Sequence, residues 1–212
     1  MSKKLDPKYQ KKQKFEVHLI TLGDSAVGKT SLIGRYIDNY FSNNYIGTFG
    51  LDSQFKKKKI KLQNGEEINV KITYTAGQER YKSIANNYIK KANGILLVYD
   101  ITNKESFQNV FMCGMEIKEK SEVSKPIILI GNKLDLEDKR VITKEQGQEF
   151  AKKYCDGGIN FYETSCKTGE NVNEAIDDLV NQVYDKYAKN NLNEGNNINL
   201  NEKQNRERGK CC

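Results

Sequence analysis

The chain of 212 residues contains no tryptophan, one histidine and two prolines. It also has no apolar stretch of the roughly 18 residues that a membrane-spanning helix needs, and its lysine-rich start lacks the apolar segment of a secretory signal. Clusters of glycine and proline that would mark an internal boundary are missing as well. We therefore expect one domain with a tail at each end, located in the cytosol.

The cysteines are few and unevenly placed, which argues against a disulfide framework or a paired metal-ligand spacing. They are Cys113, Cys155, Cys166, Cys211 and Cys212. The net charge of +7 is compatible with nucleic acid or an anionic membrane, but charge alone does not decide between partners. Residues 1–14 carry six lysines against one aspartate, which predicts a disordered basic arm whose simplest role is to keep the protein soluble.

Strand-like and helix-like patterns alternate from residue 15 to residue 187, which predicts βαβ units and a mainly parallel sheet. A strand is expected over residues 15–22 and a helix over about residues 29–39. Short apolar runs at residues 95–98 and 127–130 predict central strands that are covered on both faces. Beyond residue 187 the pattern stops, and an asparagine-rich segment predicts a second disordered tail over residues 188–212.

Two strands are expected over residues 52–62 and 66–74, on either side of the hairpin signal Asn64-Gly65, so this pair must be antiparallel. The first carries four consecutive lysines, Lys56 to Lys59. A patch for nucleic acid or lipid is one interpretation. We favour the other, an edge strand whose lysines prevent pairing with foreign strands.

The last expected helix repeats apolar residues every 3.6 positions, and Asn171 with Glu174 resembles a capping box at its start.

Residues 23–30, with the sequence GDSAVGKT, match the phosphate-binding P-loop pattern and lie between an expected strand and an expected helix. Backbone N–H groups and the helix N-terminus in such a loop surround phosphate oxygens. Lys29 would reach the β- and γ-phosphates, and the Thr30 hydroxyl would bind Mg²⁺. This pattern predicts a nucleotide site without specifying the base.

The base is indicated by the sequence Asn132-Lys133-Leu134-Asp135, directly after an apolar strand. The Asp135 carboxylate has two acceptor oxygens, which suit the N1–H and the amino group of guanine and repel the acceptor N1 of adenine. An ATP-dependent kinase is therefore disfavoured. A second polar loop, Thr164-Ser165-Cys166-Lys167, follows the next strand.

These loops, in this order and spacing, resemble those of the Ras superfamily of small GTPases. Within it, the sequences from Arg80 to Ile84 and from Leu97 to Thr102, together with the double-cysteine end, resemble the Rab branch. The implied fold is α/β, with a six-stranded sheet of five parallel strands and one antiparallel strand, surrounded by five helices. Residues 15–187 would form this G domain, with the nucleotide at the carboxyl ends of the strands.

The resemblance also implies roles for individual residues. Phe41 would stack on guanine, and Thr48 would close over Mg²⁺ and the γ-phosphate. Gly77 would sense that phosphate, and Gln78 would orient the attacking water. Catalysis would thus involve Gln78, Lys29 and Thr48, and the metal would be bound by Thr30 and Thr48. The implied nucleotide-binding residues are Asp24, Ser25, Ala26, Val27, Gly28, Lys29, Thr30, Ser31, Phe41, Thr48, Gly77, Asn132, Lys133, Asp135, Ser165, Cys166 and Lys167, with Cys166 standing where the family usually has alanine.

By the same resemblance, the protein would be a GTP/GDP switch with Mg²⁺ as cofactor, regulating vesicle-mediated membrane trafficking. No arginine finger is evident in the chain, so hydrolysis would be slow without a partner. The implied partners are an exchange factor, a GTPase-activating protein, a prenyl chaperone and effectors, and no nucleic acid. Cys211 and Cys212 resemble the signal for two geranylgeranyl chains, which stable anchoring requires. The protein would then cycle between the cytosol and the cytoplasmic face of an intracellular membrane.

The chain departs from this family at Tyr74, where the second switch normally has an aspartate that binds Mg²⁺-bound water. A neutral phenol cannot supply that negative charge, and loss of such a partner typically costs about 10- to 100-fold in metal affinity or activity. Impaired turnover, or an adaptor that binds GTP and GDP with little or no hydrolysis, is therefore an alternative. A further alternative is a sequencing or gene-model error at this position, since aspartate and tyrosine codons can differ by one base.

A second departure concerns the aromatic surface through which Rab proteins usually bind effectors. Where the family has phenylalanine, tryptophan and tyrosine, this chain has Ser53, Thr73 and Tyr88. Interface hot spots are usually aromatic, so we expect weak binding of the usual effectors unless the surface is packed differently.

His18 lies inside the first expected strand and has no clustered ligands, so it is expected to be structural.

Overall fold

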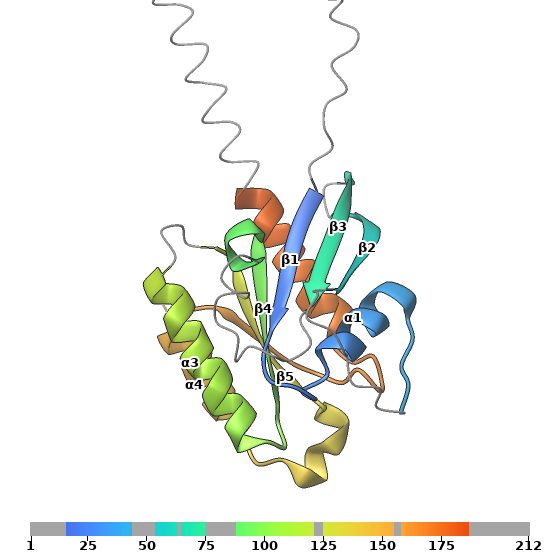
Figure 1. The fold of residues 1–212 in the computed structure, drawn as a ribbon. Coiled ribbons are helices and arrows are strands. Elements are labelled where there is room, and N and C mark those ends of the chain that lie inside the picture. The colour runs from blue at the N-terminus through green and yellow to red at the C-terminus, as the bar shows by residue number, and fades with distance from the viewer. Residues whose placement is uncertain are drawn as a thin grey trace, which may run out of the picture.

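The computed structural model describes residues 16–43, 54–62, 65–74, 88–120, 125–154 and 158–186. These residues form a six-stranded sheet in the order β2-β3-β1-β4-β5-β6, with helices packed on both faces (Figure 1). The strands are β1 (Glu16–Leu22), β2 (Gln54–Lys61), β3 (Glu67–Tyr74), β4 (Gly94–Asp100), β5 (Ile127–Asn132) and β6 (Asn160–Thr164). The helices are α1 (Lys29–Asp38), α3 (Lys104–Lys120), the 3₁₀ helix η2 (Leu134–Lys139), α4 (Lys144–Lys153) and two further helical stretches, 88–91 and 172–186.

The strand pairing confirms the predicted topology. β2 runs antiparallel to β3, and the remaining neighbours are parallel. Every residue of β4 and β5 is buried. The continuous apolar runs in their sequences had predicted this burial, because central strands are covered on both faces. Because the parallel strands end at the same edge of the sheet, the loops after β1 and β5 lie close together there.

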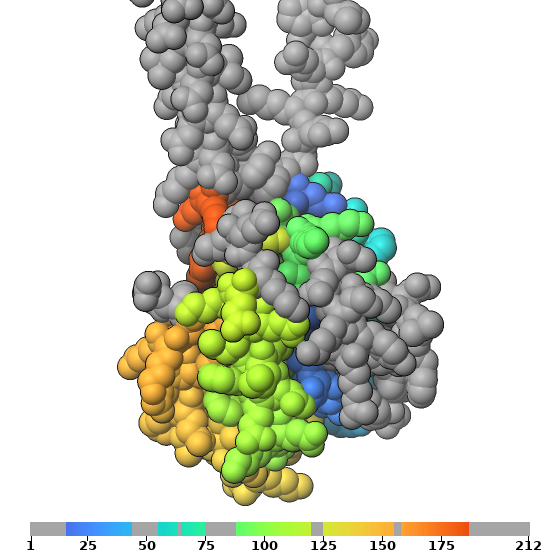
Figure 2. Space-filling model, turned by 60° about the vertical axis from the view of Figure 1, so that its left-hand side comes forward, coloured from blue at the N-terminus to red at the C-terminus, as the bar shows by residue number. Residues whose placement is uncertain are grey.

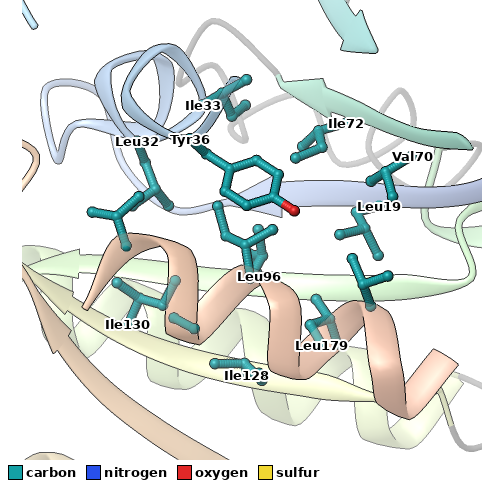
Figure 3. Close-up of a cluster of buried hydrophobic side chains, with 14 of the residues drawn as sticks. Leu19, Leu32, Ile33, Tyr36, Val70, Ile72, Leu96, Ile128, Ile130 and Leu179 are labelled. Atoms are coloured by element: carbon teal, nitrogen blue, oxygen red, sulfur yellow. The ribbon is translucent and has the colours of Figure 1, made fainter. Parts of the chain in front are cut away.

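Two apolar clusters fill the space between the sheet and its helices. One joins α1 and the helix over residues 172–186 to one face of the sheet, and in Figure 3 the Tyr36 ring lies between α1 and the strands that carry Leu19 and Leu96. The other joins α3 and α4 to the opposite face. These two helices lie side by side in Figure 2. Between them, the centroids of the Phe111 and Phe150 rings are 5.1 Å apart.

β2 is the first strand in the sheet order, which confirms the predicted edge strand. Its lysines alternate between two faces. Lys56 forms an ion pair with Asp38, and the Lys58 ammonium donates to the Tyr36 carbonyl at 2.6 Å and lies 4.3 Å from the centre of the Tyr36 ring. The lysine run therefore also attaches the edge strand to α1.

Two smaller predictions have different outcomes. His18 behaves as a structural residue, since its Nε2 lies 2.7 Å from the Thr73 hydroxyl on the neighbouring strand. The capping box expected at Asn171 is wrong. Asn171 has a left-handed φ of 56°, and its side-chain amide donates to the Glu163 carbonyl at 2.8 Å. An N-cap residue needs an extended backbone, which Thr143 at the start of α4 has, and the reciprocal box forms there with Gln146.

None of the helices in the described ranges is long and apolar enough to cross a membrane. The expected basic arm and asparagine-rich tail lie outside the described residues.

Candidate functional site

The predicted phosphate-binding loop connects β1 to α1. At Gly23 (φ 142°) a Cβ atom would come within 2.0 Å of the Val98 carbonyl oxygen, so only glycine lets the loop lie against β4. The first turn of α1 contains no acidic residue, and its N-cap residue, Gly28, makes no side-chain cap. The helix dipole therefore favours an anion at this helix start.

Lys29 places its charge inside this loop. The side chain is buried, and its ammonium donates to the carbonyls of Gly23 at 2.5 Å and Asp24 at 2.7 Å. The Asp24 carboxylate accepts a hydrogen bond from Asn109 of α3 at 2.7 Å, which ties the loop to the other side of the site. Among the other predicted loop residues, Ser25, Ala26 and Thr30 are exposed, Ser31 is half-buried and Val27 is buried.

Asn132, the last residue of β5, connects the loops expected to bind phosphate and base. Its side-chain amide is 2 % exposed and donates through Nδ2 to the Val27 carbonyl at 2.8 Å. Its Oδ1 accepts from the Thr164 hydroxyl at 3.2 Å and from the Cys166 thiol at 3.3 Å. A Cβ atom on Gly28 would lie 2.3 Å from Asn132 Nδ2, so this glycine is required for the contact.

Lys133 and Asp135, the two charged residues of the predicted base-reading sequence, are each held by a different partner. Lys133 has a left-handed φ of 72°, and its ammonium lies 2.7 Å from an Asp100 carboxylate oxygen at the end of β4. The Ser165 hydroxyl donates to Asp135 Oδ1 at 2.6 Å, while the Asp135 side chain stays exposed. The carboxylate is therefore oriented and also accessible to a ligand.

The loop after β6 is fixed from the opposite side by Arg35 of α1. The Arg35 guanidinium donates to the carbonyls of Cys166 at 2.8 Å and Lys167 at 2.9 Å. Burial raises the pKa of the Cys166 thiol to about 12, while Lys167 is exposed. Sequence reasoning missed Arg35, because nothing in the α1 sequence distinguishes it from an ordinary solvent-facing arginine.

Tyr74 lies at the end of β3 and is 5 % exposed, within the apolar cluster that also contains Val27 and Tyr36. Burial raises the pKa of its phenol; the Lys56 ammonium lowers it and the Asp38 carboxylate raises it to smaller extents. The phenol is therefore neutral at physiological pH. It contributes apolar packing at the position where the family that the sequence resembles has a carboxylate.

The described residues do not by themselves form the expected magnesium site. Mg²⁺ usually needs one or two carboxylates besides substrate phosphates. Of the two expected ligands, Thr30 offers one exposed hydroxyl, and Thr48 lies outside the described residues. No group of three or more histidine, cysteine, aspartate or glutamate side chains is placed to hold a metal in the described part of the chain.

The remaining predicted site residues divide into two groups. Phe41 is half-buried and packs against the apolar cluster between α1 and the sheet, and its expected stacking on guanine stays a prediction. Thr73, expected in the effector surface, is 3 % exposed. Tyr88, expected in the same surface, packs against the apolar cluster between the sheet and the helices α3 and α4. Others lie outside the described residues: Thr48, Ser53, Gly77, Gln78, Cys211 and Cys212.

Comparison with known proteins adds an independent observation. A model of the Ras family matches residues 18–185. The chain is 42 % identical over 165 residues to Ras-related protein Rab-13 of Mesocricetus auratus, an alignment that covers 78 % of each chain. It is also 42 % identical over 171 residues to Ras-related protein Rab-15 of Homo sapiens, covering 81 % of this chain and 78 % of the relative. Ras-related protein Rab-3C of Bos taurus is 42 % identical over 170 residues, covering 80 % and 72 % respectively.

Proposed function

This chain belongs to the Ras family, as a Rab-like small GTPase, and on that premise we propose that it is a guanine-nucleotide switch in vesicle-mediated membrane trafficking. In this role it binds GTP and GDP and hydrolyses GTP slowly. The observation that carries the proposal is the double attachment of Asn132, to the phosphate-binding loop through Val27 and to the loop after β6 through Thr164. It supports the proposal because it connects the loop expected to bind phosphate with the loops expected to bind the base.

Selection of guanine is assigned to Asp135. Ser165 occupies one carboxylate oxygen at 2.6 Å, and the side chain is exposed at the edge of the sheet. A carboxylate accepts hydrogen bonds and cannot donate them, so it pairs with the N1–H and amino group of guanine and repels the acceptor N1 of adenine. Lys133 and Asp100 support the same loop through their ion pair of 2.7 Å.

Replacement of Asp135 by asparagine tests this assignment. The amide has a donor where the carboxylate has an acceptor, so Asp135→Asn should weaken GDP binding about 100-fold or more and favour xanthosine diphosphate, which has a carbonyl in place of the amino group. Isothermal titration of both nucleotides measures this change. Asp138→Asn, which makes the same change in η2, should bind GDP like the wild type. If Asp135→Asn keeps the wild-type preference, the assignment fails.

Hydrolysis is assigned to Gln78 and Thr48, with Lys29 on the phosphates, as in the family pattern. Without an arginine supplied by a partner, the expected rate is on the order of 10⁻⁴ s⁻¹. A second candidate function is an adaptor with weak Mg²⁺ retention and little or no hydrolysis. Tyr74 favours it, because a buried neutral phenol provides no negative charge beside the metal position.

Single-turnover GTP hydrolysis with and without Mg²⁺ distinguishes the two candidates. For the adaptor, wild type and Tyr74→Phe hydrolyse GTP at an equally low rate that Mg²⁺ barely changes. Tyr74→Asp then gains Mg²⁺ affinity of about 10- to 100-fold. Because the Tyr74 ring is buried, Tyr74→Asp also loses stability, so its fold is checked by circular dichroism. Mg²⁺-dependent turnover by the wild type at the family rate would instead favour the switch.

Membrane attachment is assigned to Cys211 and Cys212, each carrying a geranylgeranyl chain. The protein then cycles between the cytosol and the cytoplasmic face of an intracellular membrane, with a prenyl chaperone, an exchange factor, a GTPase-activating protein and effectors as partners. Imaging of a tagged protein beside its double-cysteine deletion tests the anchor. Unchanged membrane association after the deletion would refute it.

A further inference from the structure

The orientation of the Asn132 amide follows from its contacts. Nδ2 lies 2.8 Å from the Val27 carbonyl oxygen, an acceptor only, so the amino group must face the phosphate-binding loop. The Asn132 oxygen therefore faces Thr164 and Cys166, whose hydroxyl and thiol are the donors at 3.2 Å and 3.3 Å. Turning the amide over would place two oxygen atoms against each other at Val27.

Cys166 is suited to donate in this position. Its side chain is 3 % exposed, and burial raises its pKa to about 12, so the thiol keeps its hydrogen at neutral pH. The Cys166 backbone is held in place because the Arg35 guanidinium donates to its carbonyl at 2.8 Å. The sulfur also lies 3.9 Å from the Gly28 carbonyl of the phosphate-binding loop. An alanine here, as in the usual family pattern, would have no donor for Asn132.

We propose that Cys166 is a positioning residue for nucleotide binding, which donates its thiol hydrogen to Asn132 Oδ1 and so keeps the Asn132 amide attached to the phosphate-binding loop. The inference rests on the proposed binding of guanine nucleotides and adds to it the role of a residue that stands where the family usually has alanine. Thr164 supplies the second donor to the same oxygen. Of these three successive side chains, Thr164 and Cys166 thus donate to Asn132, and Ser165 between them donates to Asp135.

A different explanation assigns the sulfur to packing alone. In that case alanine and serine at position 166 both remove the sulfur atom and should have similar effects. If the thiol acts as a donor, the two variants differ, because the serine hydroxyl can donate to the same acceptor and alanine cannot. The pair Cys166→Ala and Cys166→Ser therefore separates the explanations.

The experiment measures dissociation of GDP carrying a fluorophore on its ribose from the full chain, after dilution into excess unlabelled GDP. We expect Cys166→Ala to dissociate about two- to tenfold faster than wild type, the equivalent of one hydrogen bond, and Cys166→Ser to remain within about twofold. Cys113→Ala is the matched control, since Cys113 lies on α3 in the other apolar cluster, and it should match the wild type.

Equal rates of GDP dissociation from wild type and Cys166→Ala would overturn the positioning role. It would also be overturned if Cys166→Ala and Cys166→Ser released GDP faster than wild type by the same factor. Thermal unfolding of the GDP-bound proteins provides a second readout, in which packing alone predicts the same loss of stability for alanine and serine. If the wild type binds no labelled GDP, the proposed function itself fails. If it binds GDP and the alanine variant behaves identically, only the role of Cys166 fails.

Discussion

Thr21 and Tyr74 are directly aligned on the adjacent parallel strands β1 and β3. Side chains alternate along a strand, so both point to the face that carries Leu19 and Ile72. Thr21 is fully buried, and its hydroxyl has no hydrogen-bond partner in the described part of the chain. The strand pair thus carries an unpaired hydroxyl beside the residue that departs from the family.

Removal of this hydroxyl should stabilise the protein. Valine keeps the shape of threonine and replaces the unpaired oxygen with a methyl group, so Thr21→Val should raise the free energy of unfolding by about 1–2 kcal/mol. Thermal unfolding should then occur roughly 2–8 °C higher. Thr164→Val is the matched control, because the Thr164 hydroxyl is equally buried but bonded to Asn132, and it should lower the unfolding temperature. A lower unfolding temperature for Thr21→Val as well would contradict the prediction.

Gly28 and Gly65 permit a test of steric contact against backbone strain. Both have a positive φ, 99° and 86°, but an added Cβ meets Asn132 only at Gly28 and open space at Gly65. Either alanine should cost about 1–2 kcal/mol of strain. Gly28→Ala should in addition weaken GDP binding by about tenfold or more, because it displaces the Asn132 amide. Titration with GDP measures this difference, and equal affinities for the two variants would exclude the steric explanation.

The half-buried Arg140 forms an ion pair 2.6 Å long with the buried Glu163, with side chains 15 % and 7 % exposed. Arg140→Ala leaves the Glu163 carboxylate buried without this cation, so we expect a loss of about 3–5 kcal/mol in urea unfolding. Lys153→Ala removes an exposed pair with Glu149 and should change the stability by about 0.5 kcal/mol or less. Similar losses in the two variants would show that burial does not distinguish these pairs.

His18, the only histidine of the chain, gives the stability a pH dependence. Burial lowers its pKa below 6.5, and the Lys71 charge lowers it further, against smaller opposite effects of the Lys91 backbone and Glu16. The unfolded chain therefore binds the proton more readily. The contribution of His18 is complete above pH 6.5 and is lost as the pH falls through the lowered folded-state pKa. Urea midpoints between pH 5 and 8 should decline on acidification in the wild type and less in His18→Gln; parallel curves would contradict this.

Much of the fold could be predicted because its signals are local or periodic. The apolar runs of β4 and β5 and the hairpin at Gly65 gave the correct strands and pairing. The lysine run on β2 predicted an edge strand, but the contacts of Lys58 with Tyr36 depend on α1, about 20 residues earlier in the chain, and could not be predicted. The cap at Asn171 failed for a similar reason, because the bond of its side chain to Glu163 accompanies a left-handed backbone that no local pattern indicates.

The candidate site was predicted in its residue types but not in its connections. The loop patterns predicted that Asn132, Asp135 and Cys166 contact one ligand. They did not show that Asn132 reaches back 105 positions to Val27, because that contact requires the folded sheet. The burial of Thr73 likewise depends on tertiary packing and changes what the sequence suggested about an effector surface.

The contacts of Arg35 have a consequence for nucleotide exchange. One guanidinium connects α1, which begins at the phosphate-binding loop, to the two carbonyls that follow Ser165. Arg35 thus connects the two loops that are expected to enclose the nucleotide. We therefore expect a displacement of α1 to disturb the guanine end of the site as well, which would speed release of the nucleotide.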